Sequence, residues 1–337
     1  MKITTVGLDI AKNVFQVHAI DEHERVVIRK KLRRSEVLPF FSKIDRCVVG
    51  IEACGTAHYW ARAIELLGHD VKLLPASYVK PYVKRSKNDA ADAEAICEAV
   101  TRPTMRFVPI KTTDQQSVLM LHRTRDLLVR QRTMIVNALR GHLAEYGLVV
   151  GKGIENLQRL INLVETENSG LPRIARQALS TLVAQVSELQ RRVRALEQEI
   201  LTWHRDSAAS QRLATIPGIG PITATAMVAS LGDAAQFRSG RRLAAWLGLV
   251  PRQNSSGGKE RLGRISKQGD MYIRRLLVLG ATSVIRVARG RTTPLSNWIN
   301  QLLARRPPRL VSVALANKLA RVAWVVLSRG QAYAIAA

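Results

Sequence analysis

The first hundred residues alternate short apolar runs with stretches whose apolar positions follow a helical spacing. That spacing predicts helices over residues 56–67 and 89–100, with Thr56 and Asn88 as N-caps. The apolar runs predict β-strands at residues 3–10, 14–20, 25–32, 47–51 and 71–74. The chain therefore opens on an α/β domain, which we place at residues 1–112.

A helical region follows, which we place at residues 113–206. Its first helix, predicted over 115–148, is rich in Arg and Leu, and a looser glycine-containing segment comes next. A second helix then carries the alternating three- and four-residue spacing that predicts a coiled coil, at Leu179, Leu182, Val186, Leu189, Val193, Leu196 and Ile200. The alternative is an amphipathic helix that packs on its own domain.

The remainder, residues 207–337, is predicted to be mostly helical, with one glycine-rich basic loop at 254–269. Near its start, the sequence IPGIG and the apolar helix after it resemble a helix-hairpin-helix motif. In such a motif, the glycines (here Gly218 and Gly220) let backbone N–H groups approach a DNA phosphate without reading bases. The alternative is an ordinary Gly-Pro connector between two helices.

The charge of the chain indicates a polyanionic partner. The 337 residues include 52 Lys and Arg against 26 Asp and Glu, a formal net charge of +26. The excess is uneven, because residues 206–337 hold 20 basic and 4 acidic side chains while residues 1–205 hold 32 and 22. Nucleic acid is the simplest partner for such a chain. The alternative is a generally basic protein with no such partner.

Cysteine usage and hydropathy bear on the compartment. The three cysteines form neither a CxxC pair nor a zinc-binding spacing, which is typical of a reducing cytoplasm. The N-terminus lacks the long apolar run of a signal peptide. The most apolar C-terminal stretch, 310–327, contains Lys318 and Arg321, so we expect no membrane partner and a cytoplasmic, nucleoid-associated protein.

Four carboxylates lie where predicted elements end or begin. Asp9 is within the first strand, Glu52 follows strand 47–51, and Asp89 and Asp92 open a helix three residues apart, on one helix face. A charge inside the apolar run around Asp9 is costly unless it is paired or binds a metal. Four oxygen donors suit Mg²⁺, and two such ions about 4 Å apart can assist phosphodiester chemistry. We predict a Mg²⁺ site; the alternative is a turn residue and a helix-dipole pair.

The basic loop offers a second candidate chemistry. Lys259, Arg261, Arg264 and Lys267 can neutralise phosphates, and the hydroxyl of Ser256 can attack a phosphodiester. The alternative is a passive phosphate-binding loop in which Ser256 only donates a hydrogen bond.

Several segments carry a family resemblance. GLDIAKNVFQVHAID, GIEACGTAHYWARAI and KRSKNDAADAEAIC resemble segments of the DEDD-type insertion-sequence transposases of the family numbered one-ten. That family includes Piv-type DNA invertases and bridge-RNA-guided recombinases. The likeness continues through IPGIGPITA, RRLAAWLGLVPRQNSSGGKERLGRISKQGD and the C-terminal helices. It covers nearly the whole chain and is strongest to the eleven-eleven subgroup.

The resemblance implies a fold, a site and partners. Three meandering strands followed by alternating helices and strands is the order of a ribonuclease-H-like domain, and the resemblance implies its Holliday-junction-resolvase version. It assigns the metal to the four carboxylates above and a nucleophilic serine to Ser256, with Ser255 adjacent. It also implies double-stranded donor and target DNA, a guide RNA encoded by the element, and a dimer or active tetramer. In the family, the serine and carboxylates of one active site come from different subunits.

The leading hypothesis is a Mg²⁺-dependent DNA transposase that exchanges strands through a phosphoserine intermediate. A first rival is a structure-selective nuclease in which the metal activates water and Ser256 is passive. A covalent protein–DNA adduct separates these two. A second rival is a non-catalytic nucleic-acid scaffold, which cleavage that disappears with EDTA would exclude.

Overall fold

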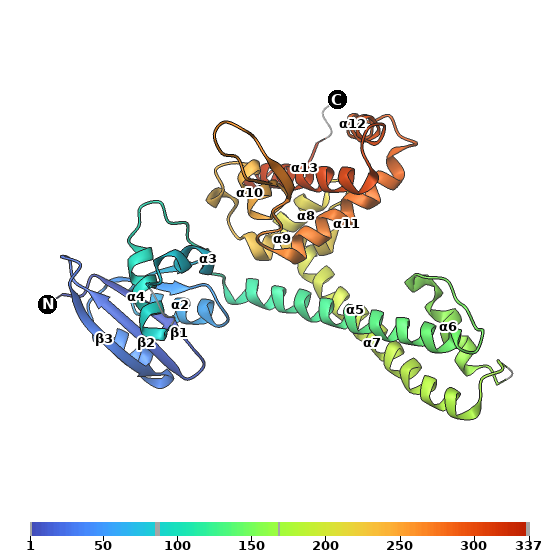
Figure 1. The fold of residues 1–337 in the computed structure, drawn as a ribbon, viewed down its shortest axis with the longest axis horizontal. Helices are drawn as coiled ribbons and strands as arrows, with labels where there is room; N and C mark the ends of the chain where they lie inside the picture. The colour runs from blue at the N-terminus through green and yellow to red at the C-terminus, as the bar shows by residue number, and fades with distance from the viewer. Residues whose placement is uncertain (1, 85–87, 168, 335–337) are drawn as a thin grey trace. The chain divides into compact units, whose positions relative to one another are not determined.

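The computed structural model describes residues 2–84, 88–167 and 169–334. Contacts divide the chain into two compact units, residues 1–112 and residues 113–337 (Figure 1). The second unit contains both the helical region and the C-terminal part, whose separation at residue 206 stays a prediction.

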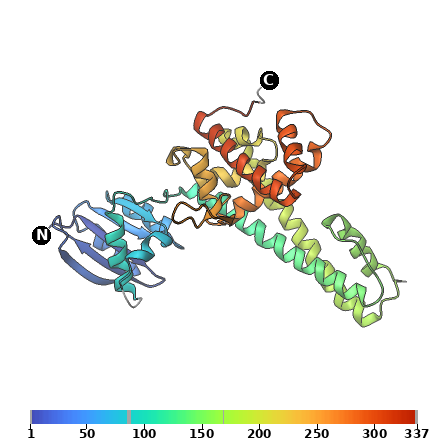
Figure 2. The same ribbon diagram turned by 45° about the horizontal axis from the view of Figure 1, so that its top comes forward.

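A five-stranded sheet forms the centre of the N-terminal unit (Figures 1 and 2). Its order is β3-β2-β1-β4-β5; β1 to β3 are antiparallel, and β4 and β5 run parallel to β1. The strands are β1 (Thr5–Ile10), β2 (Val14–Ile20), β3 (Val26–Arg33), β4 (Val48–Glu52) and β5 (Asp70–Leu74). This mixed topology is compatible with a ribonuclease-H-like domain.

Helices cover both faces of this sheet. On one face, α4 (Asp89–Val100) packs against β1, β2 and β4. On the other face, Trp60 of α2 (Ala57–Glu65) meets Phe15 of β2 edge-to-face, in a core that includes α1 (Val37–Phe41). The short elements are α3 (Ala76–Val79), η1 (Arg34–Glu36) and η2 (Lys80–Tyr82).

The two predicted N-caps behave differently. The Asn88 side chain accepts a hydrogen bond of 2.9 Å from the Ala91 N–H, so the predicted cap of α4 is confirmed. Thr56 occupies the N-cap position of α2, but its backbone is left-handed with φ +71° and its side chain makes no capping hydrogen bond. A capping side chain usually needs an extended backbone to reach the first turn, so Thr56 is at the predicted N-cap position but its side chain does not cap the helix.

An antiparallel helical hairpin begins the second unit. Arg125 and Arg132 of α5 bond Glu197 and Gln190 of α7, and this reversed register shows that the two helices run in opposite directions (Figure 1). The elements are α5 (Thr113–Ala144), η3 (Ile154–Asn156), α6 (Leu157–Glu165) and α7 (Arg173–Asp206). The segment expected to be loose thus contains an amphipathic helix, α6, whose apolar side packs on α7.

The heptad positions of α7 face partners in the same chain. Most of them are buried, including Leu179, Val186, Leu189, Val193 and Ile200. They contact α5, α6 and α9, and Leu189 is 7% exposed. The helix α7 therefore packs as an amphipathic helix on its own chain, which is the alternative that the sequence left open.

Six helices and a 3-10 turn surround the largest core of the molecule. They are α8 (Ala208–Ala214), α9 (Pro221–Leu231), η4 (Ala234–Gln236), α10 (Gly240–Trp246), α11 (Met271–Ala288), α12 (Pro294–Leu303) and α13 (Pro308–Arg329). Between α10 and α11, the expected loop is a two-stranded antiparallel hairpin made of β6 (Pro251–Gln253) and β7 (Leu262–Ile265).

One helix among the described residues is long and apolar enough to cross a membrane by length and composition. This is α13, with a mean hydropathy of 1.7 over its most apolar window. Lys318 and Arg321 therefore do not take this stretch below the apolarity of a membrane span, as its two charges were expected to do. Some of its apolar side chains, including Leu315 and Leu319, are buried against α10 and α11, whereas Leu310 and Val325 are exposed.

Candidate active site

Three of the four predicted carboxylates come together where β1 ends and α4 begins. One carboxylate oxygen each from Asp9, Asp89 and Asp92 lies within 4.8 Å of the others. Asp9 and Asp92 are half-buried and Asp89 is exposed. Like charges this close repel one another unless they share a cation or a proton. Hard oxygen donors in such a cluster suit Mg²⁺.

Two glycines allow α4 to approach the sheet closely enough for this convergence. A Cβ on Gly7 would lie 2.2 Å from a backbone carbonyl oxygen of α4, and one on Gly50 would lie 2.9 Å from a side chain of α4. Asp9 and Glu52 follow these glycines by two residues, so they face the same side of the sheet. Sequence reasoning missed the two glycines. Their signal was a glycine inside each strand, which often marks a close backbone approach.

Glu52 lies beside the aspartate cluster but outside the three-residue group. Leu8 of β1 pairs with Ile51 of β4 in parallel register, so Glu52 follows at the same edge of the sheet as Asp9. Partial desolvation, then the charge of Glu52 and then that of Asp9, raise the pKa of the Cys54 thiol. The Glu52 and Asp9 carboxylates therefore both lie close enough to Cys54 for their charges to affect its thiol.

A buried amide beside Asp9 tests whether a cation fits. Gln16 lies directly opposite Asp9 in the β1–β2 register and is 7% exposed. Its Oε1 atom has no hydrogen-bond partner among the described residues. A buried acceptor left unpaired costs about 1–3 kcal/mol, which a cation or a cation-bound water would offset. The three carboxylates and this amide oxygen together fit Mg²⁺, and Gln16 is a candidate that sequence reasoning missed.

Ser255 and Ser256 have different surroundings in the β6–β7 hairpin. The Ser255 Oγ accepts a hydrogen bond of 3.2 Å from the Arg261 N–H, across the hairpin. The Ser256 carbonyl accepts one of 3.1 Å from the Lys259 N–H, while its exposed side chain has no hydrogen-bond partner in the part of the chain described. The Ser255 hydroxyl is therefore used by the hairpin, and that of Ser256 is available.

The turn after Ser256 requires glycine. Gly257 and Gly258 have φ values of +56° and +75°, as in the type I′ turns that form the two-residue loops of β-hairpins. A Cβ at either position would meet open space, so backbone conformation alone selects glycine here. The turn places Ser256 at the exposed tip of the hairpin.

The predicted phosphate-binding residues line this hairpin. Lys259, Arg261, Arg264 and Lys267 are all exposed. Among the described residues, none of the four is in an ion pair. Their charges therefore act outward, where a polyanion would meet them.

The base of the hairpin is held firmly. The buried Arg274 guanidinium donates to the carbonyl oxygens of Leu247 at 2.9 Å and Gln268 at 2.7 Å. A Cβ on Gly269 would lie 1.9 Å from the Trp246 carbonyl oxygen, so the returning chain packs directly on α10. The tip is exposed while the base is part of the core.

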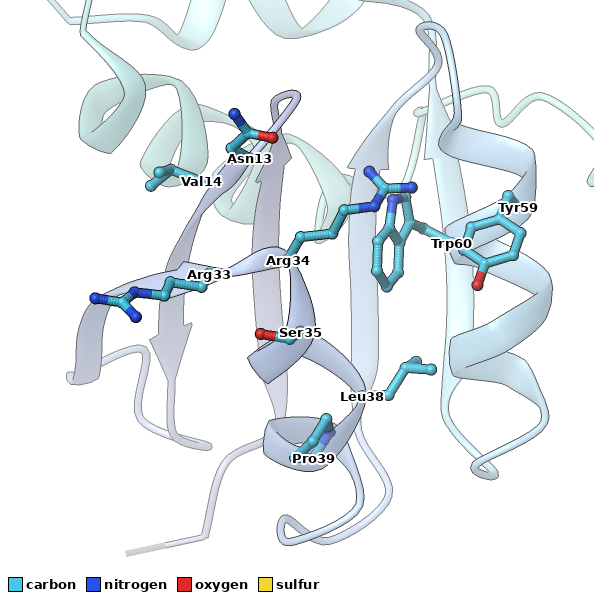
Figure 3. Close-up of a pocket in the computed structure, with 9 residues that line it drawn as sticks. All are labelled: Asn13, Val14, Arg33, Arg34, Ser35, Leu38, Pro39, Tyr59 and Trp60. Carbon is cyan, nitrogen blue, oxygen red and sulfur yellow. The ribbon is translucent and has the colours of Figure 1, made fainter.

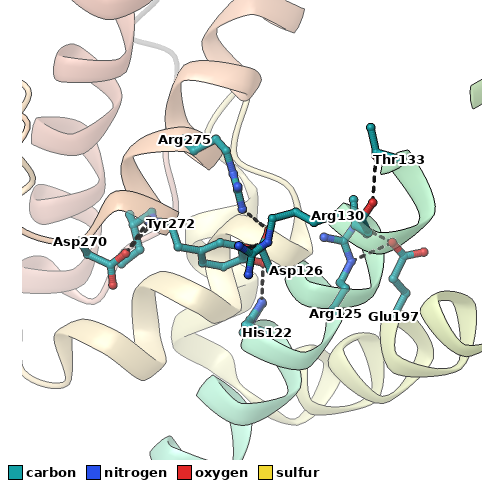
Figure 4. Close-up of polar contacts among 11 residues, drawn as sticks. His122, Arg125, Asp126, Arg130, Thr133, Glu197, Asp270, Tyr272 and Arg275 are labelled. Atoms are coloured by element: carbon teal, nitrogen blue, oxygen red, sulfur yellow. Dashed lines mark hydrogen bonds and ion pairs between the residues drawn. The ribbon is translucent and has the colours of Figure 1, made fainter. Parts of the chain in front are cut away.

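A buried histidine joins three helices next to this base (Figure 4). His122 of α5 lies 3.1 Å from the Tyr272 hydroxyl of α11 and 3.0 Å from the Thr225 hydroxyl of α9. The Thr225 hydroxyl donates to the Pro221 carbonyl, so the histidine Nε2–H donates to Thr225 and Tyr272 donates to Nδ1. Burial, followed by the charge of Arg125, lowers the pKa of His122 to about 4. His122 is therefore a neutral structural connector.

The two glycines of the hairpin-like segment between α8 and α9 have separate surroundings. Gly218 has φ +89°, and a Cβ on Gly280 of α11 would lie 1.8 Å from its carbonyl oxygen. Gly218 therefore serves close packing between backbones. Gly220 is exposed at the N-cap of α9, where no side chain caps the helix. Of the two, Gly220 is the better placed to meet a phosphate.

The mixed five-stranded sheet is compatible with a ribonuclease-H-like domain, and an acidic cluster that can hold divalent cations is a feature of many enzymes that cut or join nucleic-acid strands. Two family descriptions match the chain. The DEDD transposase model of the IS110 type matches residues 6–148, and the transposase model of the IS116/IS110/IS902 family matches residues 210–294. The chain belongs to this IS110-type family of DEDD transposases.

Similar proteins extend over nearly the full chain. A probable family 20 transposase of Pseudomonas aeruginosa is 50% identical over 99% of both chains. The transposase for insertion sequence element IS1328 of Yersinia enterocolitica is 41% identical over 98% of both. The transposase for insertion sequence element IS1111A of Coxiella burnetii is 39% identical over 98% of this chain and 91% of its own. The likeness to the eleven-eleven subgroup is thereby confirmed.

Proposed function

We propose that this transposase cuts and rejoins DNA with Mg²⁺ at the aspartate cluster and with Ser256 as nucleophile. The observation that carries the proposal is the convergence of Asp9, Asp89 and Asp92, with Gln16 opposite Asp9 and its Oε1 atom unbonded among the described residues. Asp9, Asp89 and Asp92 would hold the metal, with Glu52 at the same sheet edge. When bound, Mg²⁺ supplies positive charge that stabilises the negative charge developing on a phosphate.

In the proposed serine step, one bond to phosphorus forms as another breaks, and the serine proton moves to the leaving group. The Ser256 oxygen forms a bond to the phosphorus, and the bond from phosphorus to the 3′-oxygen of the DNA strand breaks. The serine proton passes to the leaving 3′-oxygen, with a carboxylate of the cluster as the carrier. The reverse attack by a 3′-hydroxyl on a partner DNA rejoins the strand and frees the serine. Support comes from the Ser256 hydroxyl, which no other described residue engages, and from the Ser255 hydroxyl, which accepts from Arg261.

The C-terminal part supplies the proposed DNA contacts. Residues 271–337 contain eleven basic and no acidic side chains. Arg274 is buried and Arg275 pairs with Asp126, but Arg286, Arg289, Arg291 and most of the other basic side chains are exposed. Together with the hairpin cations and Gly220, they favour phosphate contacts that position DNA without reading its sequence. We also propose an element-encoded guide RNA as the source of sequence choice, on the family resemblance, and no membrane partner.

A matched pair of variants tests the metal site. Asp9→Asn should reduce Mg²⁺-dependent strand cleavage by more than the ~100-fold that losing a residue that merely orients a ligand costs. DNA binding should stay near that of the wild type or tighten, since one repulsive charge is gone. Asp45→Asn, at an exposed aspartate of the same unit, is the control and should cleave normally. Full activity of Asp9→Asn, or cleavage that persists in EDTA, would contradict the metal site.

We further propose that the enzyme acts as a dimer or tetramer, through α5 rather than α7. Met120, Leu127 and Met134 of α5 are 66%, 47% and 70% exposed and recur every seven residues. These residues form one exposed apolar row along a helix face, and we propose that a second copy of the chain covers this row. The buried heptad of α7 already has its partners in the same chain.

Light scattering and thermal unfolding distinguish the two helices. Leu127→Asp should lower the oligomer mass and leave the melting temperature near that of the wild type, because the side chain is exposed. Leu189→Asp should lower the melting temperature, because it buries a charge within one chain. If only Leu189→Asp lowers the oligomer mass, the contact between subunits is made by α7 and not by α5.

A further inference from the structure

A pocket of about 790 Å³ opens on the N-terminal unit, at the sheet edge where Asp9 lies (Figure 3). One wall is the β1–β2 turn and the end of β3, where Val14 pairs with Arg33. The other wall is α2. Trp60 of this wall packs on Phe15, which points to the opposite sheet face from Asp9. The pocket and the aspartates thus lie at the same end of the sheet, where β1 ends and β2 begins, but on opposite faces of the sheet.

The lining combines cations with exposed aromatic surface. Arg33 and Arg34 are exposed, Tyr59 is 50% exposed, and none of the lining residues is acidic. The Arg34 guanidinium lies over Trp60, 5.0 Å from the ring centroid, as Figure 3 shows. Proteins that bind single-stranded nucleic acid combine cations that follow the backbone with aromatic rings on which bases stack. This pocket contains both.

A buried donor on the pocket wall has no acceptor. Trp60 is 3% exposed, and its Nε1–H has no hydrogen-bond partner among the described residues. Indole N–H groups usually find a partner when buried. The Nε1 atom itself is buried, so the groups that a ligand entering the pocket would meet are the exposed Tyr59 ring and the Arg33 and Arg34 guanidinium groups.

We propose that this pocket binds one unpaired nucleotide of a strand whose backbone continues round the sheet edge to the aspartate cluster. The base stacks on Tyr59, and Arg33 and Arg34 hold the adjoining phosphate. The proposal rests on the proposed function for its polymer, a nucleic-acid strand at the metal site. Stacking and phosphate binding are common to DNA and RNA, so the exposed DNA strand and the guide RNA are the two possible sources. A paired duplex keeps its bases stacked inside and does not offer one to the pocket.

Fluorescence anisotropy of the full chain in EDTA tests the pocket without any need for catalysis. The probes are a labelled single-stranded DNA, an RNA of the same sequence and a fully paired DNA duplex. Tyr59→Ala should weaken binding of a single strand about tenfold, the usual effect of removing one stacking ring, and leave the duplex unchanged. Tyr59→Phe keeps the ring and should bind as the wild type does. Tyr78→Ala, at a tyrosine 43% exposed outside the pocket, is the matched control.

Salt dependence gives a second readout that does not depend on the aromatic ring. Arg33→Ala should reduce the slope of log affinity against log salt by about 0.7 for a single strand, the value for one phosphate contact. Arg46→Ala, at an exposed arginine of the same unit outside the pocket, should leave it unchanged.

The outcomes separate this proposal from the proposed function. Weakening of the DNA probe alone or the RNA probe alone supports the pocket and identifies the source, and weakening of both supports the shared chemistry. If Tyr59→Ala and Arg33→Ala bind all three probes as tightly as the wild type does, the proposed nucleotide site is overturned. The same holds if the variants weaken duplex binding as much as single-strand binding. In both cases the proposal of metal-dependent cleavage still stands. Loss of cleavage in Asp9→Asn has no bearing on it.

Discussion

Asp9 and its neighbours are held by a sheet and a helix that meet across closely packed glycines, whereas Ser256 lies at the exposed tip of a two-stranded hairpin. The first region is pre-organised, because α4 packs on β1 and β4 too closely to admit a Cβ at Gly7 or Gly50. The second is held at its base, where Arg274 bonds the Leu247 and Gln268 carbonyl oxygens and Gly269 packs on α10, while its tip is exposed. Under the proposed mechanism, the rigid carboxylate set would receive the phosphate and the exposed hairpin tip would deliver the nucleophile.

The largest expected effect comes from removing a glycine on the rigid side. Gly7→Ala places a Cβ 2.2 Å from a backbone oxygen of α4, which cannot move as a side-chain tip can. It should destabilise the N-terminal unit by about 3 kcal/mol or more, the upper end for overpacking, and abolish cleavage. Thermal unfolding and a cleavage assay measure both effects.

Gly257→Ala is the matched change on the hairpin side. Its Cβ meets open space, and only the positive φ of +56° opposes it, at about 1–2 kcal/mol confined to the turn. The melting temperature of the second unit should hardly change, while serine-dependent strand transfer should slow. Equal global destabilisation by both alanines would remove the contrast between the two regions.

The pH dependence of stability tests how firmly the base of the hairpin is anchored. The pKa of His122 is lowered from 6.5 to about 4, so below pH 6.5 the unfolded chain binds a proton that the folded chain does not. Stability from this group is complete above pH 6.5 and lost as pH falls to about 4, by about 3 kcal/mol. His122→Gln should remove that part of the slope in urea unfolding. Identical slopes in wild type and variant between pH 6.5 and 4 would show that His122 does not act as the structure indicates.

A smaller effect is expected at the buried amide. Gln16→Leu removes the unpaired Oε1 atom and keeps a side chain of similar size. The Mg²⁺ concentration for half-maximal cleavage should rise about 10–100-fold, with the rate at saturating Mg²⁺ less affected. An unchanged Mg²⁺ requirement would mean that the amide serves the fold alone.

Local patterns in the sequence predicted much of this architecture. The five strands lie within two residues of their predicted positions, because alternation and run length are local signals. The helix cap at Asn88 and the placement of Asp89 and Asp92 on one helix face could be predicted for the same reason. The helices that pack on the heptad positions of α7 could not be predicted, because a heptad pattern shows that a helix face is buried but not which helix covers it. The convergence of Gln16 with Asp9 depends on strand register, which the sequence specifies only through the completed sheet.

The serine region shows a related limit. The glycine pair and the basic residues predicted a loop, but the cross-strand hydrogen bonds that make it a hairpin involve residues whose sequence carries no strand pattern. The family resemblance placed the nucleophile at Ser256 with Ser255 beside it. The structure adds a physical reason to favour Ser256, since the Ser255 hydroxyl is engaged by Arg261.

The most direct test of the central claim is whether DNA becomes linked to Ser256. Wild type, Ser255→Ala and Ser256→Ala would be incubated with labelled donor DNA, Mg²⁺ and RNA from the non-coding DNA that flanks the gene. Adducts would be separated on denaturing gels and mapped by mass spectrometry. We predict an adduct on the peptide that contains Ser256 in the wild type, at least part of it in Ser255→Ala, and none in Ser256→Ala, with no change in melting temperature. Mg²⁺-dependent cleavage by Ser256→Ala, with no adduct in the wild type, would show that water is the nucleophile and contradict the serine mechanism.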